Sequence, residues 1–387
     1  MEYSKEVMMA RDWILTSGIQ NTGGTEKGGF NAWYDIKDDN YSFVYSEITG
    51  YGITTLLFIN KFFDGNYLDK AREAAQWLER KALHPCGGVK TRYYLKALKE
   101  SENYSFESEN IYAFDNGMVL YGLINLYKIF RDEKYLELSE RIAGFLLRKM
   151  KRPDGLFYAV YNARTNQKID DNWKWSTQSG SYLAKLALGF TDLYEATKTR
   201  EYKDTVIELS EAAMKFQDPS GRFITARTDR STHLHPHMYS GEGLFYAGVR
   251  FNRKDLIESS VKAVRWALDN QAGDGGIPKK YVDNKFVNYY RSDALAQVIR
   301  LGSLQRELGY LAESDVEKLG KAKKCLLSFQ LLDDEYQKGG FYYGYTLDGK
   351  KTDHINSWCT MFALQALISL ERIGKKAGEE NILEFFI

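Results

Sequence analysis

The sequence predicts an all-α protein of about twelve helices, arranged as a closed ring of six helical hairpins, an (α/α)6 toroid. Two observations predict this fold. A short glycine turn recurs six times along the 387 residues, and each turn separates a charged amphipathic segment from a mainly apolar one. Both patterns run from one end of the chain to the other, so we expect one toroidal domain over residues 1–387.

The repeated turn sequences are GGF, GGV, GLF, GRF, GGI and GGF. Their anchoring glycines are Gly29, Gly88, Gly155, Gly221, Gly276 and Gly340. Successive intervals are 59, 67, 66, 55 and 64 residues, which gives a loose period of about 62 residues. Six units of this length account for nearly the whole chain.

The segments on the two sides of each turn differ in polarity. Residues 67–83 and 135–150 place apolar side chains at spacings of three and four among charged ones, as in outward-facing helices. Residues 46–62, 114–130 and 176–196 are apolar nearly all round, so we expect buried inner helices. Small residues near the inner-helix starts would let neighbouring helices converge. They are Gly50, Gly117, Gly180, Gly241 and Ala294.

Composition narrows the possible partners. Lys and Arg total 53 against 52 Asp and Glu, so no basic surplus attracts nucleic acid. No apolar run reaches the roughly 18 residues of a membrane span. The first 20 residues lack the apolar core of a secretory signal, and three widely spaced cysteines fit a reducing compartment. We expect a cytoplasmic protein without a membrane span; the oligomeric state stays open.

No cofactor or metal is expected from the motifs. The glycine-rich run at 273–276 joins two predicted helices, whereas a nucleotide-binding loop follows a strand. The acid that terpenoid cyclases carry in a DxDD motif is also missing, because the nearest run is Asp35-Ile-Lys-Asp38-Asp39.

Six segments carry a resemblance to known proteins. They are SEITGYGITTLL, FDNGMVLYGLINLY, TQSGSYLAKLALGFTDLYE, HPHMYSGEGLFYAG, SDALAQVIRL and HINSWCTMFALQAL. The chain resembles the six-hairpin toroid proteins of the prenyltransferase/squalene-cyclase-like kind and the six-hairpin glycosidase superfamily, which are associated with polysaccharide metabolism. The resemblance implies an (α/α)6 toroid and carbohydrate chemistry, with hydrolases, polysaccharide lyases and sugar epimerases as the possible activities.

One rim of such a ring gathers the first turns of all inner helices, whose partial positive charge favours anionic groups. Glu47 and Asp115 occupy equivalent positions there, three and two residues before Gly50 and Gly117. Inverting glycoside hydrolases need an acid and a base roughly 6.5–9.5 Å apart, and adjacent helices pack at about 8–10 Å. The two carboxyls therefore form a candidate acid/base pair. Equally, they could be first-turn acids that offset helix dipoles.

The segment HLHPHMYSGEG holds three of the five histidines. We interpret it as a loop around Pro236, which offers too few converging ligands for a metal site. His237 or His235 beside Tyr239 could move the proton that a uronate lyase or epimerase removes. The more ordinary interpretation is a histidine that bonds a backbone carbonyl near the helix start.

Aromatic and polar side chains on the same rim suit a sugar, which has one apolar face and a rim of hydroxyls. Packing between helices is an equally good interpretation of any single aromatic. Arg291 with Asp293, and the group around His354, could bind a uronate carboxylate or a pair of hydroxyls. Ordinary surface ion pairs are the alternative.

We therefore expect a carbohydrate-processing enzyme acting on an oligosaccharide or polysaccharide. A glycoside hydrolase is the first hypothesis, a uronate-directed lyase or epimerase the second, and a non-catalytic glycan-binding toroid the third. The candidate catalytic residues are Glu47, Asp115, His237, Tyr239 and Glu242. The candidate substrate-binding residues are Trp33, Tyr45, Tyr112, Trp173, Trp175, Gln178, His235, Tyr290, Arg291, Asp293, His354, Asn356 and Trp358.

Overall fold

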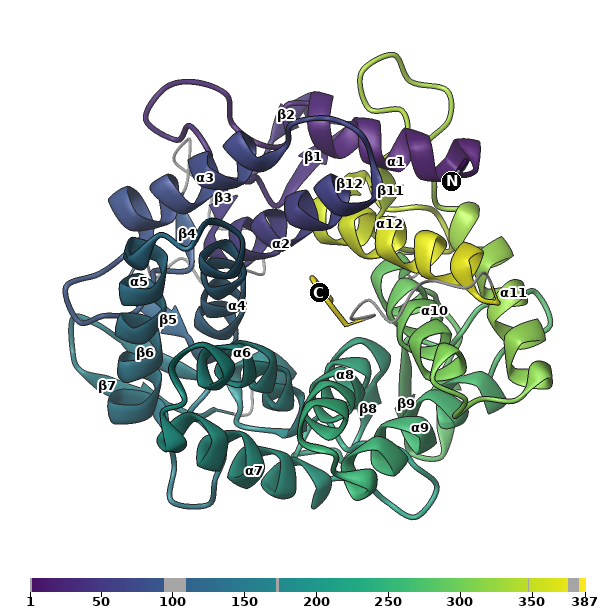
Figure 1. The fold of residues 1–387 in the computed structure, drawn as a ribbon. Helices are drawn as coiled ribbons and strands as arrows, with labels where there is room; N and C mark the ends of the chain where they lie inside the picture. The colour runs from purple at the N-terminus through teal and green to yellow at the C-terminus, as the bar shows by residue number, and fades with distance from the viewer. Residues whose placement is uncertain (1, 94–108, 172–173, 347, 375–382) are drawn as a thin grey trace.

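The computed structural model describes residues 2–93, 109–171, 174–346, 348–374 and 383–387. Its α-helices form two concentric rings (Figure 1). The outer ring consists of α1 (Lys5–Thr16), α3 (Leu68–Trp77), α5 (Glu133–Phe145), α7 (Arg200–Met214), α9 (Lys254–Asp269) and α11 (Glu313–Leu327). The inner ring consists of α2 (Ser46–Phe62), α4 (Ala113–Phe130), α6 (Ala187–Thr197), α8 (Leu234–Phe251), α10 (Ser292–Glu307) and α12 (Ser357–Arg372). The (α/α)6 toroid is thus confirmed.

The two rings differ in burial, as the polarity of their segments predicts. Every residue of α10 from Ser292 to Gln305 is buried. In α9, buried apolar positions alternate with exposed charged ones along the helix. The outer helices α3 and α5 continue into single π-turns at 78–82 and 146–150, where the chain leaves the outer ring for the glycine turn.

Close backbone approach holds α2 against α4. A Cβ atom added to Gly50 would lie 2.8 Å from the carbonyl oxygen of Met118, and one added to Gly122 would lie 2.8 Å from the carbonyl oxygen of Gly50. Glycine costs helix stability, so the gain from this packing must offset it.

The third inner helix begins later than predicted. Residues 175–177 and 181–186 form 3₁₀ turns, and α6 starts only at Ala187. The expectation that Gly180 allows close packing is wrong, since its nearest neighbour would lie 3.6 Å from an added Cβ, on Tyr182. Gly243 of α8 is the tight position instead, with the Ala184 carbonyl oxygen at 2.1 Å from an added Cβ.

Short antiparallel strands link neighbouring repeats above the inner helices. The strand that precedes an inner helix pairs with a strand in the loop of the next repeat. The pairs are β3 (Val44–Tyr45) with β4 (Arg92–Tyr93), β5 (Asn110–Tyr112) with β6 (Val160–Asn162), and β8 (Thr232–His233) with β9 (Lys280–Val282). The sheets are extended by β7 (Gln167–Ile169) and β10 (Lys285–Val287).

The same pairing closes the ring between the last repeat and the first. β12 (His354–Asn356) pairs with β1 (Trp33–Asp35), and β2 (Asn40–Tyr41) and β11 (Phe341–Tyr342) complete a four-stranded sheet. In this register Trp33 lies opposite Asn356 and Asp35 opposite His354. Two segments over 300 residues apart in sequence therefore meet at one point of the rim.

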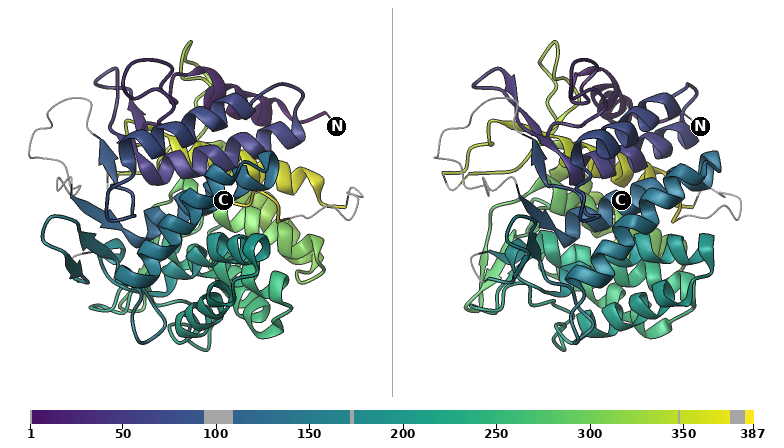
Figure 2. Two further views of the ribbon diagram at one scale, coloured as in Figure 1. Left: turned by 60° about the vertical axis from the view of Figure 1, so that its left-hand side comes forward. Right: turned by 90° about the vertical axis from the view of Figure 1, so that its left-hand side faces the viewer.

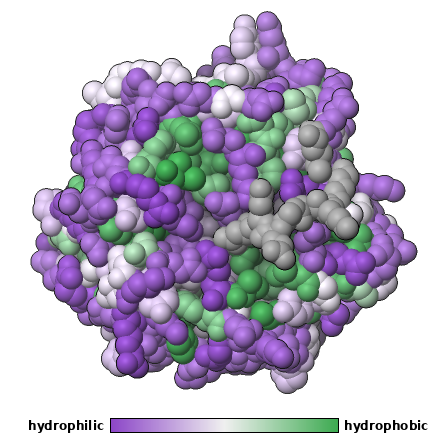
Figure 3. All heavy atoms as spheres, viewed as in Figure 1, coloured by the Kyte–Doolittle hydropathy of each residue, from purple (hydrophilic) through white to green (hydrophobic). Residues whose placement is uncertain are grey.

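Residues 383–387 lie inside the ring (Figures 1 and 2). Phe386 and Ile387 are buried, and the side-chain amide of Gln365 donates to the Phe385 carbonyl oxygen at 2.6 Å and accepts from the Ile387 amide at 3.2 Å. The face of the ring seen in Figure 3 is mainly hydrophilic, with separate apolar patches. No helix in the described ranges is long and apolar enough to cross a membrane.

Gly243→Ala tests the close approach of α8 to the third repeat. The added methyl would meet the Ala184 carbonyl, so we expect a loss of about 1–3 kcal/mol in the free energy of unfolding. Gly320→Ala on α11 is the matched control, because an added Cβ there meets nothing within 4 Å. This variant should gain roughly 0.5–1 kcal/mol in the free energy of unfolding. Urea denaturation measures both; equal effects would contradict the packing argument.

Candidate active site

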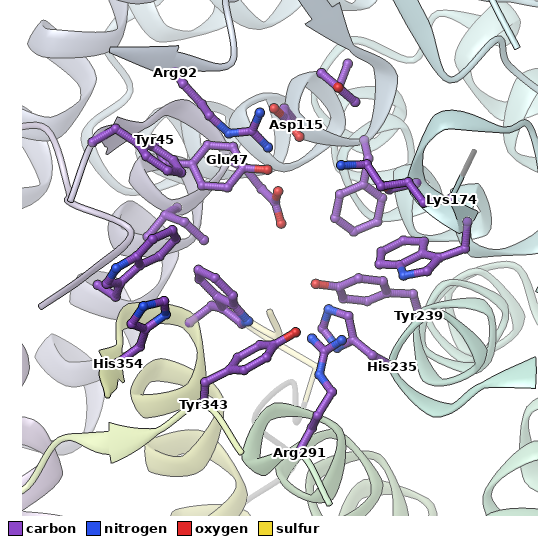
Figure 4. A pocket seen from close by; sticks show the side chains of 18 of the residues that line it. Tyr45, Glu47, Arg92, Asp115, Lys174, His235, Tyr239, Arg291, Tyr343 and His354 are labelled. Atoms are coloured by element: carbon purple, nitrogen blue, oxygen red, sulfur yellow. The ribbon is translucent and has the colours of Figure 1, made fainter. Parts of the chain in front are cut away.

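A pocket of about 570 Å³ opens on the rim where the inner helices begin. All six repeats contribute to its lining (Figure 4). Along the chain, the repeats run counterclockwise in Figure 1 and clockwise in Figure 4. The two figures therefore view opposite faces of the ring, and the pocket opens on the face turned away in Figure 1. The rim geometry that the repeat predicts is therefore present.

Eleven of the residues predicted for the site line this pocket. They are Trp33, Tyr45, Glu47, Tyr112, Asp115, Trp175, His235, Tyr239, Arg291, His354 and Trp358. Further lining residues include Asp35, Phe43, Arg92, Phe114, Lys174, Tyr182 and Tyr343.

Glu47 and Asp115 meet on one wall (Figure 4). Their carboxyl groups are hydrogen bonded to each other, and Thr91 donates a further hydrogen bond to Asp115. Burial, and then the Asp115 charge, raise the pKa of Glu47 well above its ordinary value. Burial likewise raises the pKa of Asp115 to about 6. Burial of two interacting carboxyls therefore favours one shared proton on the Glu47–Asp115 pair near neutral pH.

The expected separation of these two carboxyls is wrong. A spacing of roughly 6.5–9.5 Å would leave room for a water and a glycosidic bond between them, whereas the hydrogen bond brings Glu47 and Asp115 into direct contact. The close approach of α2 to α4 at Gly50 and Gly122 explains the difference, since it brings the first turns of both helices together.

Arg92 lies beside the carboxyl pair (Figure 4). Its guanidinium stands 5.2 Å from the ring centre of Tyr45 and 5.3 Å from that of Phe43, and its charge lowers the pKa of both Glu47 and Asp115. Lys174 also lines the pocket. Burial, and then the charge of Arg92, lower its pKa to about 8.

His235 and Arg291 form another part of the wall (Figure 4). Arg291 binds Asp293 through Nε and Nη2, at 3.0 and 2.5 Å. Trp358 Nε1 also donates to Asp293, at 3.0 Å. Asp293 is fully buried and holds these two side chains in place from outside the pocket. Burial lowers the pKa of His235 to about 4, so its ring is neutral at pH 7.

The ring closure supplies a third group. His354 stacks on Trp33 with ring centres 4.5 Å apart and 11° between the planes. Its Nε2 lies 3.4 Å from an Asp35 carboxylate oxygen. Figure 4 shows His354 on the left of the pocket, between Tyr45 and Tyr343, and Asp115 at the top.

Tyr239 also lines the pocket. Its hydroxyl accepts a hydrogen bond from Tyr51 at 3.2 Å, and burial raises its pKa well above 10. Below it, Glu242 is fully buried and bound to Lys185 and Arg300. Burial lowers the pKa of Lys185 to about 7. Tyr239 is therefore a hydrogen-bonding group in its neutral form, and Glu242 lies beneath the pocket instead of lining it.

His235 and His237 point in different directions because they lie on a helix. The prediction of a loop around Pro236 is wrong, since α8 begins at Leu234. Two residues span about 200° of a helix, so His237 faces the outer ring. Its Nδ1 accepts from the Phe223 amide at 3.1 Å and its Nε2 lies 3.0 Å from the Ala263 carbonyl oxygen. Backbone groups thus occupy both ring nitrogens of His237.

Three more predicted residues stabilise the fold and do not line the pocket. Tyr290 packs on Gly276 and donates to Asp274 at 3.0 Å. Gln178 accepts from the Arg227 amide at 2.7 Å, and Asn356 caps α12 through the Cys359 amide. Trp173 lies outside the described residues.

Comparison with known proteins gives a family match and structural neighbours. The model of glycosyl hydrolase family 47 matches residues 89–247. The mannosyl-oligosaccharide alpha-1,2-mannosidase IA of Drosophila melanogaster is 27% identical over 120 residues, which are 30% of this chain and 18% of that protein. The mannosyl-oligosaccharide 1,2-alpha-mannosidase IB of Mus musculus is 22% identical over 231 residues, 56% of this chain. The match spans a third of the length of that relative.

Solved structures match over almost the whole chain. Cellobiose 2-epimerase from Bacillus thermoamylovorans B4167 has a TM-score of 0.76 and 12% identity, covering 94% of this chain and 98% of its own. Unsaturated glucuronyl hydrolase from Bacillus sp. GL1 has a TM-score of 0.67 and 16% identity, covering 95% and 97%. These matches confirm the (α/α)6 toroid fold.

Asp115→Asn tests the state of the carboxyl pair without a ligand. The pKa of Asp115 is about 6 in the folded protein and 3.8 ordinarily, so the folded state binds this proton more tightly than the unfolded state. Its stabilising contribution is full below pH 4 and is lost as the pH rises through 6. Relative to the wild type, the variant should gain roughly 1–3 kcal/mol in the free energy of unfolding between pH 4 and pH 7.

Asp154→Asn is the control of opposite sign, because Arg152 helps to lower the pKa of Asp154. That variant should lose stability relative to the wild type as the pH rises toward 4, and the difference should change little between pH 4 and pH 7. Chemical denaturation at both pH values measures the two differences. If the Asp115→Asn difference stayed constant with pH, the raised pKa of Asp115 would be ruled out.

Proposed function

We propose that this protein is a carbohydrate-processing enzyme, specifically a glycoside hydrolase whose proton donor is Glu47. The observation that carries the proposal is a proton-sharing carboxyl pair on the wall of an aromatic pocket. The match to glycosyl hydrolase family 47 supports it and includes Asp115, His235 and Tyr239. The mannosidase relatives make α-linked mannosides the first substrates to test.

The pocket suits a sugar in size and lining. Its volume of about 570 Å³ lies within the range of small-ligand sites, so it holds a short part of an oligosaccharide or polysaccharide. Trp33, Tyr45 and Trp175 offer flat apolar faces to a pyranose ring, while Arg92, Lys174 and Arg291 offer hydrogen-bond donors to its hydroxyls.

In the proposed reaction, Glu47 gives its proton to the glycosidic oxygen as the bond from that oxygen to the anomeric carbon breaks. A raised pKa keeps Glu47 protonated for this step. The carboxylate left on Glu47 would lie beside the Asp115 charge, and the positive charge of Arg92 offsets this repulsion.

A second group must accept the proton of the attacking water. Because Glu47 and Asp115 are in contact, Asp115 cannot stand on the other side of the glycosidic bond. Asp35 and His354 line the pocket together, with an Asp35 carboxylate oxygen 3.4 Å from His354 Nε2. We assign the base to this group: water bonds to the anomeric carbon and its proton passes to Asp35 or His354.

A proton-transferring epimerase or isomerase is the second candidate function. The observation in its favour is a neutral histidine, His235, on the pocket wall. The likeness to cellobiose 2-epimerase and D-mannose isomerase structures is compatible with this chemistry. In such a reaction a neutral imidazole would take a proton from the carbon beside the sugar carbonyl.

Glu47→Gln tests the hydrolase. On α-1,2-mannobiose and a panel of neutral and acidic oligosaccharides, the variant should lose about 10²- to 10⁴-fold in kcat. Binding by calorimetry should be nearly unchanged, because glutamine keeps the size and hydrogen-bonding capacity. Glu195→Gln is the matched control, since Glu195 pairs with Arg250 in the last turns of α6 and α8, away from the pocket.

Three outcomes separate the hypotheses. Loss of turnover with retained binding supports the hydrolase. Binding without turnover in the wild type would establish a glycan-binding toroid instead. Equal turnover by wild type and Glu47→Gln would refute Glu47 as the donor.

Solvent exchange tests the second candidate. An epimerase or isomerase working through proton removal incorporates deuterium from D₂O into the carbon beside the carbonyl, whereas hydrolysis leaves every carbon-bound hydrogen in place. We expect no exchange in D-mannose or cellobiose by proton NMR if the protein is only a hydrolase. Exchange in the wild type that disappears in His235→Gln would favour the epimerase.

A further inference from the structure

A fully buried charged cluster lies directly beneath the pocket. The Glu242 carboxylate binds Lys185 Nζ at 2.8 Å and Arg300 Nη2, and no part of these three side chains is exposed. Replacing such a cluster by apolar residues often costs nothing or stabilises a protein. Stability alone therefore gives no reason for these charges.

The cluster fixes the orientation of a neighbouring amide. Gln297 Nε2 donates to the second Glu242 oxygen at 3.2 Å. A carboxylate paired with the Arg300 guanidinium can only accept hydrogen bonds, so the amide nitrogen of Gln297 must face Glu242. The carbonyl oxygen of the same amide then faces away from Glu242, toward His235.

Two hydrogen-bond acceptors lie near the same ring nitrogen of His235. Gln297 Oε1 lies 2.7 Å from Nδ1, and Asp293 Oδ2 lies 3.4 Å from it. Both atoms lack a hydrogen to donate, so Nδ1 must carry one. In a neutral imidazole the other nitrogen, Nε2, then has a free lone pair. No described residue hydrogen-bonds to Nε2.

We propose that Glu242 and Gln297, with Asp293, are positioning residues that hold His235 as the Nδ1–H tautomer and direct the Nε2 lone pair into the pocket. Nε2 is then an acceptor for a hydroxyl of the bound ligand. That last point rests on the proposed sugar-processing function, whereas the tautomer does not.

This arrangement gives the two walls opposite roles. The Glu47–Asp115 pair offers a proton, and His235 offers a lone pair. Glu242 thus acts on the site through Gln297 and His235 without touching the ligand.

Nitrogen NMR of protein labelled with ¹⁵N-histidine reads the tautomer directly, in the absence of any ligand. The chain has five histidines, and loss of one signal set in His235→Gln assigns the resonances. At neutral pH the wild type should show a protonated Nδ1 and an unprotonated Nε2. A protonated Nε2, alone or together with Nδ1, would overturn the proposal.

Two variants test the positioning residues. Gln297→Met removes the nearer acceptor with little change of shape, and should weaken the Nδ1–H hydrogen bond and move the Nδ1 proton resonance upfield. Adding Asp293→Leu removes the second acceptor and should populate the Nε2–H tautomer. Gln305→Met, on the same helix but bonded to Ser260, is the matched control and should leave the His235 signals unchanged.

Unchanged His235 signals in Gln297→Met would overturn the role of Gln297 even if the double variant failed to fold. Since none of these spectra needs a substrate, they hold or fail independently of the hydrolase assay. A correct tautomer in a protein without hydrolase activity would keep this inference and discard only the proposed reaction.

Discussion

Closure of the ring between β12 and β1 is the constraint on which the pocket depends. Without that pairing, the first and last inner helices would expose their apolar faces to water, as an open solenoid would at its two ends. Closure also brings side chains of the candidate site together. It stacks Trp33 on His354 and brings Asp35 to the same imidazole, although these residues are more than 300 positions apart in the chain.

Inside the closed ring, close helix packing decides how the charged groups behave. Glycine at two positions of the α2–α4 contact lets the backbones touch, and the acids on the first turns then share a proton. Arg92 lowers the pKa of both acids, yet burial is the larger influence on each. The Glu47–Asp115 pair thus shares one proton. The His235 ring is neutral because burial outweighs the nearby Asp293 charge.

The sequence predicts the fold and part of the site for physical reasons that are visible in its residues. Six glycine turns and two alternating helix types determine a ring, and equivalent positions at helix starts place Glu47 and Asp115 together. The lengths of the intervening loops follow no pattern, so Arg92 and Lys174 could not be assigned to the pocket. Their positions depend on strand pairing such as Tyr45 with Arg92.

Helix register explains the other differences. Pro236 lies in the first turn of α8, where proline is favoured. Interpreted in that way, the histidine-rich segment would have been assigned to a helix, with His235 and His237 on different faces. The late start of α6 has no comparable signal, because Ser-Gly-Ser is compatible with both a helix start and an extended segment.

The residues at 383–387 give the ring a further property. Phe385, Phe386 and Ile387 are buried within the bore, against Gln365 and Arg300 of two inner helices. The described part of the toroid is consequently a cup and not a tunnel. Within the described residues, a linear glycan cannot pass along the bore beyond this buried segment.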